Sequence, residues 1–329
     1  MWIADRWNDY EVLDTTAGEK LERWGDYYLV RPDPQVIWNT GKHDRLWRHP
    51  NGHYHRSKKG GGSWEFHDLP EVWTVGYNAG AGDLTFRLKP FAFKHTGLFP
   101  EQAVNWDWMT RKIQTALQKR ADKKDFSVLN LFAYTGGATL ACAAAGAKVV
   151  HVDASKGMVG WAKENAAASN LSDAPVRWLV DDCVKFVKRE IRRGHRYDGI
   201  IMDPPSYGRG PGGEVWKIED AIFDLLQLCA QLMDEDSVFF LLNSYTTGLQ
   251  PAAMGYMLAS ALRDIPESPA DGGNERTGST TPSETPDALS QAGVSFPCAG
   301  GFVTSAEIGV PVSASGLILP CGASSRWER

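Results

Sequence analysis

The spacing of hydrophobic and polar positions changes near residue 127, and this change divides the chain into two parts. Before it, short apolar runs such as YYLVR (27–31) and LTFRLKPF (84–91) alternate with turn sequences such as RPDP, HPNG and NAGAGD. Short runs bounded by Gly, Pro, Asn and Asp are typical of β-strands. The pattern predicts a small β-rich domain over residues 1–92, and we assign residues 93–329 to a second domain.

After residue 127, apolar runs alternate with helical segments. The predicted strands are SVLNLFAY, KVVHVDA, VRWLVDD, YDGIIMD and SVFFLLNS. The predicted helices are GGATLACAAAGA, SKGMVGWAKENAAASN, a segment through VKFVKREIRR, and the segments 215–233 and 251–263. This alternation predicts a mostly parallel, Rossmann-like α/β sheet that is covered by helices on both faces.

Two further features follow near the C-terminus. Residues 264–297 are rich in Pro, Gly, Ser, Thr and charged residues and have no periodicity. Such a composition predicts a disordered surface insertion, to which we assign no catalytic part. The later runs GFVTSAEIGVPV and GLILPCG predict a C-terminal antiparallel hairpin at the edge of the sheet.

The composition indicates a globular protein, because 43% of the 329 residues are hydrophobic and 23% are charged. No apolar run approaches the roughly 18 residues that a membrane-spanning helix needs, so we expect no membrane partner. The N-terminal sequence MWIADRWNDYEVLD does not have the pattern of a secretory signal. The five cysteines form no CxxC pair, which favours reduced thiols, a cytoplasmic location and no metal site.

The charge is distributed unevenly along the chain. The net charge of −5 does not indicate a nucleic-acid-binding protein. Residues 42–60, however, hold six Lys and Arg, one Asp and four His among several aromatic residues. This basic segment either contacts RNA phosphates and stacks on bases, or is only a solvated loop.

Small or acidic residues follow the first three predicted strands of the sheet. Thr135, Gly136 and Gly137 follow the first strand and begin a helix, while Asp153 and Asp182 follow the second and third. In open α/β sheets, ligands bind beyond the carboxyl ends of the strands, where a carboxylate can accept hydrogen bonds from a ribose diol. The set predicts a cofactor that carries adenosine. The turn FAYTGG lacks the G-x-G-x-x-G pattern of NAD sites, which argues against NAD.

The fourth predicted strand ends in DPPSY, residues 203–207. Prolines cannot continue a strand, because each lacks an N–H. They set a rigid turn that places the carboxylate of Asp203 beside a substrate, with Pro204, Pro205 and Tyr207 as further catalytic candidates. The segment resembles motif IV of class I S-adenosylmethionine-dependent methyltransferases, of the D/N-P-P-Y/F type that acts on nitrogen atoms.

The resemblance extends over residues 93–263 and 301–327. FKHTGLFPEQAVNWDWM, LNLFAYTGG, VDASKGMVGWAKENA, DDCVKF, DPPSYGRG and GLILPCGASSRW are similar to a bacterial methyltransferase family. That family is related to the 23S ribosomal RNA enzymes that modify cytosine C5 or guanine N7. The stretch LERWGDYYLVRPDPQVIW also looks like the small N-terminal domain of its closer members. The resemblance implies a class I methyltransferase fold and S-adenosylmethionine as the cofactor.

By this resemblance, Asp153 contacts the ribose, Asp182 the adenine, and Asp203 to Tyr207 the target. The residues that it places around the cofactor are Phe99, Pro100, Glu101, Gln102, Asn130, Ala133, Tyr134, Thr135, Gly136, Asp153, Ala154, Ser155, Asp182, Cys183 and Asp203. One position departs from the family, because Asn130 stands where many relatives have Asp.

The target atom is predicted from the cysteines. A carbon target such as cytosine C5 needs a cysteine nucleophile, yet DPPSY and LNSYTTGL, where relatives carry it, have none. We interpret Cys321, in the last apolar run, as a small buried hydrophobic residue. We therefore expect a methyltransferase of a nucleobase nitrogen in RNA, most of all ribosomal RNA. A methyltransferase of a small molecule or protein side chain, and a non-catalytic cofactor-binding module, are the alternatives.

Overall fold

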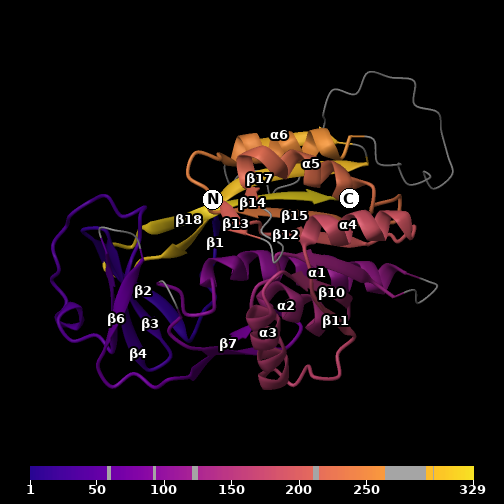
Figure 1. Cartoon of the computed structure of the whole chain (residues 1–329). Coiled ribbons are helices and arrows are strands. Elements are labelled where there is room, and N and C mark those ends of the chain that lie inside the picture. Colours follow the sequence, from indigo (N-terminus) through magenta and orange to yellow (C-terminus); the bar gives the residue numbers. More distant parts are fainter. Residues whose placement is uncertain (58–60, 92–93, 121–124, 210–214, 264–293, 299) are drawn as a thin grey trace.

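The computed structural model describes residues 1–57, 61–91, 94–120, 125–209, 215–263, 294–298 and 300–329. Within these residues, a nine-stranded sheet has α4, α5 and α6 on one face and α1, α2 and α3 on the other (Figure 1). The helices are α1 (Ala103–Lys119), α2 (Gly137–Ala144), α3 (Lys156–Ala168), α4 (Cys183–Arg192), α5 (Ile218–Ala230) and α6 (Pro251–Ala261). The predicted layered α/β fold is confirmed.

The order of the strands places the first and fourth parallel strands side by side. The strands of the main sheet are β1 (Trp2–Ile3), β9 (Ser127–Leu131), β10 (Lys148–Asp153), β11 (Val176–Val180), β12 (Gly199–Met202), β15 (Phe239–Ser244), β16 (Val294–Cys298), β17 (Gly301–Pro311) and β18 (Ile318–Glu328). Their order is β1-β17-β18-β15-β12-β9-β10-β11, and β16 also pairs with β17. The strands β11, β10, β9, β12 and β15 are parallel, so their carboxyl ends meet at one edge.

The C-terminal hairpin is present, but the prediction that it forms the sheet edge is wrong. Strand β18 lies antiparallel between β15 and β17. On its other side, β17 has two further partners. Strand β16 pairs with its first residues, and β1 pairs with Ile308 and Gly309. Strand β16 also begins inside the predicted insertion 264–297, so that prediction is wrong for its last residues. Residues 264–293 lie outside the described residues.

One helix boundary also differs from the prediction. The segment 215–233 begins with β14 (Val215–Lys217), which pairs with β13 (Tyr207–Arg209), and α5 starts only at Ile218. The residues after the DPPS turn therefore form a short hairpin before the chain becomes helical.

The first part of the chain is rich in β-structure, as predicted. It holds a five-stranded sheet, a separate hairpin and two short 3₁₀ helices, η1 (Arg45–Trp47) and η2 (Pro100–Gln102), just before α1. The sheet consists of β2 (Tyr10–Thr16), β3 (Glu19–Trp24), β4 (Tyr27–Pro32), β5 (Gly52–Arg56) and β6 (Gly62–Phe66); the hairpin consists of β7 (Trp73–Asn78) and β8 (Asp83–Leu88). The boundary between residues 92 and 93 stays a prediction.

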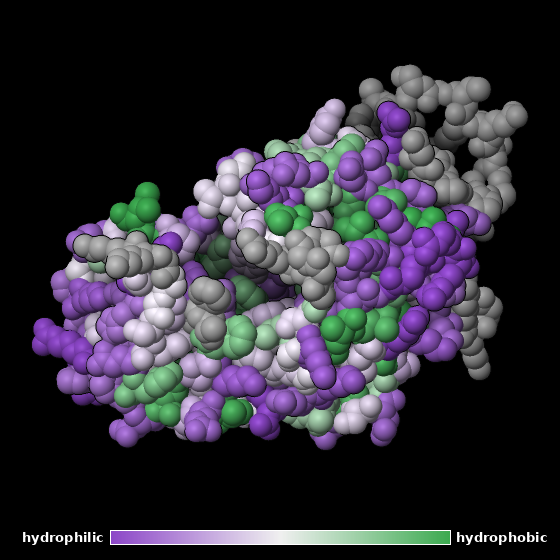
Figure 2. Space-filling model, viewed as in Figure 1, coloured by the Kyte–Doolittle hydropathy of each residue, from purple (hydrophilic) through white to green (hydrophobic). Residues whose placement is uncertain are grey.

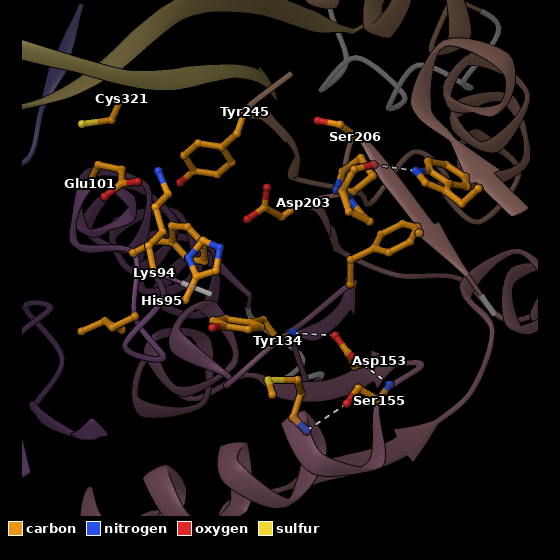
Figure 3. Close-up of a pocket in the computed structure, with 18 of the residues that line it drawn as sticks. Lys94, His95, Glu101, Tyr134, Asp153, Ser155, Asp203, Ser206, Tyr245 and Cys321 are labelled. Atoms are coloured by element: carbon orange, nitrogen blue, oxygen red, sulfur yellow. Dashed lines mark hydrogen bonds between the residues drawn. The ribbon is translucent and has the colours of Figure 1, made fainter. Parts of the chain in front are cut away.

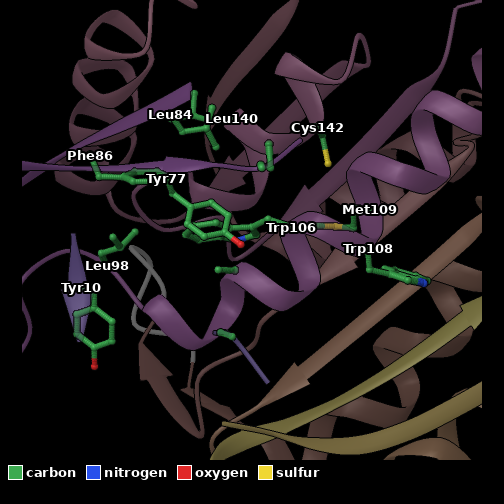
Figure 4. Packing of buried hydrophobic residues seen from close by; sticks show 14 of the residues in the cluster. Tyr10, Tyr77, Leu84, Phe86, Leu98, Trp106, Trp108, Met109, Leu140 and Cys142 are labelled. Atoms are coloured by element: carbon green, nitrogen blue, oxygen red, sulfur yellow. The ribbon is translucent and has the colours of Figure 1, made fainter. Parts of the chain in front are cut away.

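One hydrophobic cluster joins the two parts of the chain (Figure 4). The indole of Trp106 in α1 packs against Tyr77 and Phe86 of the hairpin, with ring centroids 5.7 and 5.3 Å apart. On its other side, a Cβ at Gly137 would lie 2.6 Å from the Trp106 ring, so only glycine allows α2 to start there. The shared cluster fixes the β-rich part against the sheet edge where ligands are expected.

A buried charge network holds β3 and β4 together. The Glu22 carboxylate, fully buried, accepts hydrogen bonds from Arg31 Nε at 2.6 Å and Nη2 at 2.8 Å. The Tyr10 hydroxyl donates to it at 2.8 Å, and Lys20 Nζ lies 3.3 Å away. Burial alone would raise the pKa of Glu22, but the charges of Arg31 and Lys20 and these hydrogen bonds lower it to about 2.

The substitution Glu22→Gln removes the negative charge that Lys20 and Arg31, both buried, share. We expect a loss of about 3 kcal/mol in the free energy of unfolding, measured by urea denaturation at neutral pH. Because the pKa of Glu22 is lowered to about 2, the difference should persist at neutral pH and shrink only below the ordinary pKa of glutamate.

Glu11→Gln is the matched control, because Glu11 pairs with Arg23 at 3.3 Å while the Glu11 side chain is 36% exposed. Its expected cost is below about 1 kcal/mol. Equal losses in the two variants would show that the Glu22 network does not hold the β-rich part together.

Candidate functional site

A cavity of about 920 Å³ lies at the carboxyl ends of the parallel strands. Figure 2 shows the surface hollowed between the N-terminal β-rich part and the helical part, and Figure 3 shows the cavity from close by. Its walls come from the segments after β9, β10, β11, β12 and β15, from residues 94–101, and from β3 and β4 with the residues after them. A cavity of this size is typical of cofactor and small-ligand sites.

The carboxylate of Asp153 connects the ends of β9 and β10. One oxygen accepts a hydrogen bond from the N–H of Tyr134 at 2.9 Å, and the other from the N–H of Ser155 at 2.8 Å (Figure 3). Burial raises the pKa of Asp153, and these two hydrogen bonds oppose the increase. Each carboxylate oxygen has a second lone pair, so Asp153 can still accept hydrogen bonds from a diol in the cavity.

The turn after β9 is strained where it lines the cavity. Phe132 and Tyr134 have φ values of 56° and 51°, a region that bulky residues rarely adopt. Both side chains line the cavity, and the N–H of Ala133 donates to the Val152 carbonyl at 3.1 Å. Such backbone strain is often found at binding sites.

Four residues predicted at the cofactor lie behind this wall rather than in it: Asn130, Ala133, Thr135 and Gly136. The Asn130 amide donates to Thr139 Oγ1 at 2.9 Å, and the Thr135 hydroxyl donates to the Gly97 carbonyl at 2.6 Å. A Cβ at Gly136 would lie 3.0 Å from the Cβ of Ala162 in α3, so close helix packing requires this glycine. Packing against α3 and Trp106 is thus sufficient to explain Gly136 and Gly137, and close approach of a ligand to them stays a prediction.

The ends of β10 and β11 contribute the predicted acidic and small residues. Ala154, Ser155, Asp182 and Cys183 all line the cavity. Ser155 and Asp182 are also helix N-caps, because their side chains accept from the N–H groups of Met158 and Lys185. Two helix N-termini therefore face this side of the cavity.

The DPPSY turn is only partly in the cavity. Asp203, Pro204 and Pro205 line it, but Tyr207 does not and is 52% exposed at the start of β13. The carbonyl of Pro205 accepts from the Trp216 indole at 2.7 Å, so it is occupied within the protein. The aromatic residue beside Asp203 is Tyr245, from the segment after β15 (Figure 3).

Asp203 is the titratable group of the cavity that is most clearly tuned towards neutral pH. Burial, and then the negative charge of Glu101, raise the pKa of Asp203 to about 7. Glu101 is itself 6% exposed, and burial raises its pKa as well. A carboxyl group that changes its charge near pH 7 can act as a hydrogen-bond acceptor or a proton acceptor.

Other lining residues were missed by sequence reasoning. Lys20, Arg31, Lys94, His95 and Cys321 line the cavity although the first two come from the β-rich part. Burial, followed by nearby cations, lowers the pKa of Lys94 to about 8 and that of His95 to about 4. Tyr245 was also missed: it lies in LNSYTTGL, a segment whose only predicted role concerned a cysteine that it lacks.

The predicted cofactor residues between 99 and 102 divide into two groups. Phe99, Pro100 and Glu101 line the cavity, whereas Gln102 lies behind Tyr245 and donates to its hydroxyl at 2.8 Å. None of the described residues of the basic segment 42–57 lines the cavity, and residues 58–60 lie outside the described residues.

The described residues contain neither a cluster of metal ligands nor a membrane-spanning helix. No group of three or more His, Cys, Asp or Glu residues there is arranged to hold a metal ion. Within the same part of the chain, no helix has the length and apolar character needed to span a membrane.

Comparisons with known proteins agree with this geometry. Residues 47–234 match a family model described as S-adenosylmethionine-dependent methyltransferase. A solved SAM-dependent methyltransferase from Agrobacterium tumefaciens is 34% identical, with a TM-score of 0.79, and the match covers 98% of this chain and 90% of that one. A solved structure in complex with SAH is 16% identical with a TM-score of 0.62, covers 98% of this chain and 76% of that one, and shows likeness of fold alone.

Two curated relatives carry the name ribosomal RNA large subunit methyltransferase K/L. The protein from Shewanella frigidimarina is 35% identical over 152 residues, which is 46% of this chain and 19% of the relative. The protein from Pseudoalteromonas atlantica is 39% identical over 123 residues, which is 37% of this chain and 16% of the relative. The chain therefore matches less than a fifth of the length of these relatives.

The position of Asp153 predicts a loss of ligand affinity when its charge is removed. In Asp153→Asn, the amide can no longer accept from two backbone N–H groups and a diol together. We expect affinity for S-adenosylhomocysteine, measured by calorimetry, to fall about 10- to 100-fold. Asp173→Asn, at an exposed position, should bind like the wild type. Unchanged affinity in Asp153→Asn would place the ligand elsewhere.

Proposed function

This chain belongs to the S-adenosylmethionine-dependent methyltransferase family, and on this premise we propose that it methylates a nucleobase nitrogen in RNA. The acceptor that we propose is ribosomal RNA, as in the names of the curated relatives. The observation that carries the proposal is the single cavity that joins Asp153 and Asp182 to Asp203 and Pro204. One cavity can hold both the cofactor and the acceptor in line.

The residues at the ends of β9, β10 and β11 are suited to the cofactor. In this proposal, Asp153 accepts hydrogen bonds from the ribose diol, and Asp182 and Val184 border the adenine. Phe99, whose ring centroid lies 5.5 Å from that of Tyr134, borders the methionine part. When bound, S-adenosylmethionine supplies a methyl group on a positively charged sulfur, and the protein supplies orientation and electrostatics.

Asp203 is suited to the acceptor. As a carboxylate, it can accept a hydrogen bond from an N–H of the base and direct the lone pair of the attacking nitrogen. When that nitrogen is an exocyclic amine, Asp203 can also take the proton that the amine sheds after the N–C bond forms. A ring nitrogen already carries its lone pair and needs only orientation. In duplex RNA the base would first leave the stack.

The two cysteines of the cavity support a nitrogen target. The thiol of Cys183 lies 4.0 Å from the Val152 carbonyl, and the thiol of Cys321 donates to the Leu319 carbonyl at 3.4 Å. Burial raises the pKa of both thiols well above the usual value. A thiol that stays protonated is a weak nucleophile, so neither is prepared for attack on a carbon atom of the ring.

The β-rich part supports an RNA acceptor. Strand β5 carries part of the basic segment, including Arg56 at an exposed position. On the paired strand β6, Phe66 is 52% exposed and stacks on Trp64 with ring planes 11° apart. Cations and an exposed aromatic ring on adjacent strands are the groups that single-stranded RNA contacts.

Methyl transfer should depend on the charge of Asp203. With labelled S-adenosylmethionine and total RNA from cells that lack the protein, we expect transfer to RNA that increases with pH through about 7. The reason is that the pKa of Asp203 is raised to about 7, so the carboxylate forms only above it. Asp203→Asn should reduce transfer at least about 100-fold above pH 7, and by less at lower pH, while binding S-adenosylhomocysteine normally.

The control for this experiment varies the acceptor and the salt. Transfer to RNA should fall steeply as salt is added, because phosphate contacts release counterions. Salt-insensitive labelling of a protein or small-molecule fraction, with none in RNA, would instead support the second candidate function, which the net charge of −5 favours. Cofactor binding with no transfer to any fraction would indicate a non-catalytic module.

The absence of covalent catalysis can be tested at Cys321. We expect Cys321→Ala to keep at least half of the wild-type rate of transfer to RNA, because a protonated thiol contributes no nucleophile. Cys229→Ala, at a buried position outside the cavity, controls for packing losses. Abolished transfer in Cys321→Ala alone, with normal cofactor binding, would point to a carbon target.

A further inference from the structure

We propose that Glu101 is a second carboxylate that recognises the acceptor base, facing Asp203 across the cavity and oriented by a buried hydrogen-bond relay that starts at Arg326. This inference rests on the proposed function and adds to it a residue that determines specificity. It also moves Glu101 from the cofactor, where the family resemblance places it, to the acceptor side of the cavity.

The relay has a fixed direction because Arg326 can only donate. Its guanidinium donates from Nε and Nη2 to Asn105 Oδ1, at 2.9 and 2.6 Å. The Asn105 amide must then donate, and does so to Gln102 Oε1 at 2.8 Å. The Gln102 amide in turn donates to the Tyr245 hydroxyl at 2.8 Å. The Tyr245 hydroxyl lies beside Glu101 (Figure 3), so its own proton can point towards that carboxyl and oppose the rise in the Glu101 pKa.

The relay is well insulated from water. Asn105 is 0% exposed, and Gln102 and Arg326 are each 6% exposed. The Asn105 amide is also close to Asn243 Oδ1, at 3.1 Å, and Ser324 Oγ, at 3.0 Å. Buried polar chains whose members are all satisfied specify one geometry. Helix α1, the segment after β15 and strand β18 thus combine to fix a single carboxylate on the cavity wall.

Glu101 and Asp203 lie on opposite sides of one part of the cavity, with Tyr245 beside both (Figure 3). After burial, the charge of Glu101 also raises the pKa of Asp203. The nearby cations Lys20 and Arg31 act on Glu101, but both are already paired with Glu22. No ion pair within 4 Å is found for either carboxyl among the described residues. An acceptor with N–H donors would satisfy both.

The two carboxyl groups would select the acceptor base by its hydrogen-bond donors. Two carboxyl oxygens on opposite sides of a cavity accept hydrogen bonds, so they favour a base that presents N–H groups on its edge. A base without such donors would leave a buried carboxylate unsatisfied, which costs far more than a lost contact in an apolar pocket. The inferred acceptor is therefore a nucleobase that carries an amino group.

The test compares Glu101→Gln and Tyr245→Phe with the wild type. We expect both variants to lower kcat/KM for labelled transfer to total RNA, about 10-fold or more. The affinity for S-adenosylhomocysteine should stay within about twofold, because the adenosine contacts are at Asp153 and Asp182. Glu307→Gln and Tyr256→Phe, both at exposed positions, are the matched controls.

A second readout separates recognition from a structural role. Glu101→Gln removes the like charge that helps to raise the pKa of Asp203, so the acid side of the pH–rate profile should shift to lower pH. A merely destabilising variant would lower the melting temperature without moving the profile.

The outcomes distinguish this inference from the proposed function. A loss of cofactor affinity in Glu101→Gln that matches the loss of rate would return Glu101 to the cofactor and overturn the inference. A wild-type protein that labels no RNA would overturn the proposed function and the base recognition that rests on it. If the wild type does label RNA, the carboxyl ¹³C titration of Asp203 tests the inference separately: a lower midpoint in Glu101→Gln supports it, and an unchanged midpoint overturns it.

Discussion

The site depends on three of the carboxyl groups that line one cavity, Glu101, Asp153 and Asp203, because a carboxylate largely removed from water must be compensated by hydrogen bonds or opposite charge. Asp153 is compensated by two backbone N–H groups, and Glu101 by the charge of Lys20, its own backbone N–H and the Tyr245 hydroxyl. Asp203 has the largest resolved shift towards neutral pH, caused by burial and by Glu101. Asp203 is thus the carboxyl with the least compensation, and the proposed acceptor nitrogen would lie beside it.

The β-rich part and the sheet form one site rather than two. The residues that line the cavity include Lys20 and Arg31 from strands β3 and β4, and the hydrophobic cluster around Trp106 holds these strands in place. The Glu22 network keeps both cations paired, so they contribute to the cavity wall without forming ion pairs with the acidic residues inside it. Folding of the first part therefore shapes one wall of the cavity.

Sequence patterns predicted the groups that follow directly from strand ends. Asp153, Asp182 and Asp203 end successive strands, and parallel pairing brings such positions to one edge. Side chains whose place depends on distant segments were not predictable. Tyr245 rather than Tyr207 lies beside Asp203, because the hairpin of β13 and β14 directs Tyr207 outward. Gly136 is explained by the approach of Ala162, a contact that no local pattern reveals.

The identity of the methylated atom tests the central claim most directly. RNA labelled by the wild-type protein would be digested to nucleosides, and the labelled nucleoside identified by chromatography and mass spectrometry. The account predicts a methyl group on a nitrogen of a base that carries an amino group. A methyl group on a ring carbon such as cytosine C5 would contradict it, because that product requires a cysteine nucleophile, whereas burial raises the pKa of both thiols in the cavity.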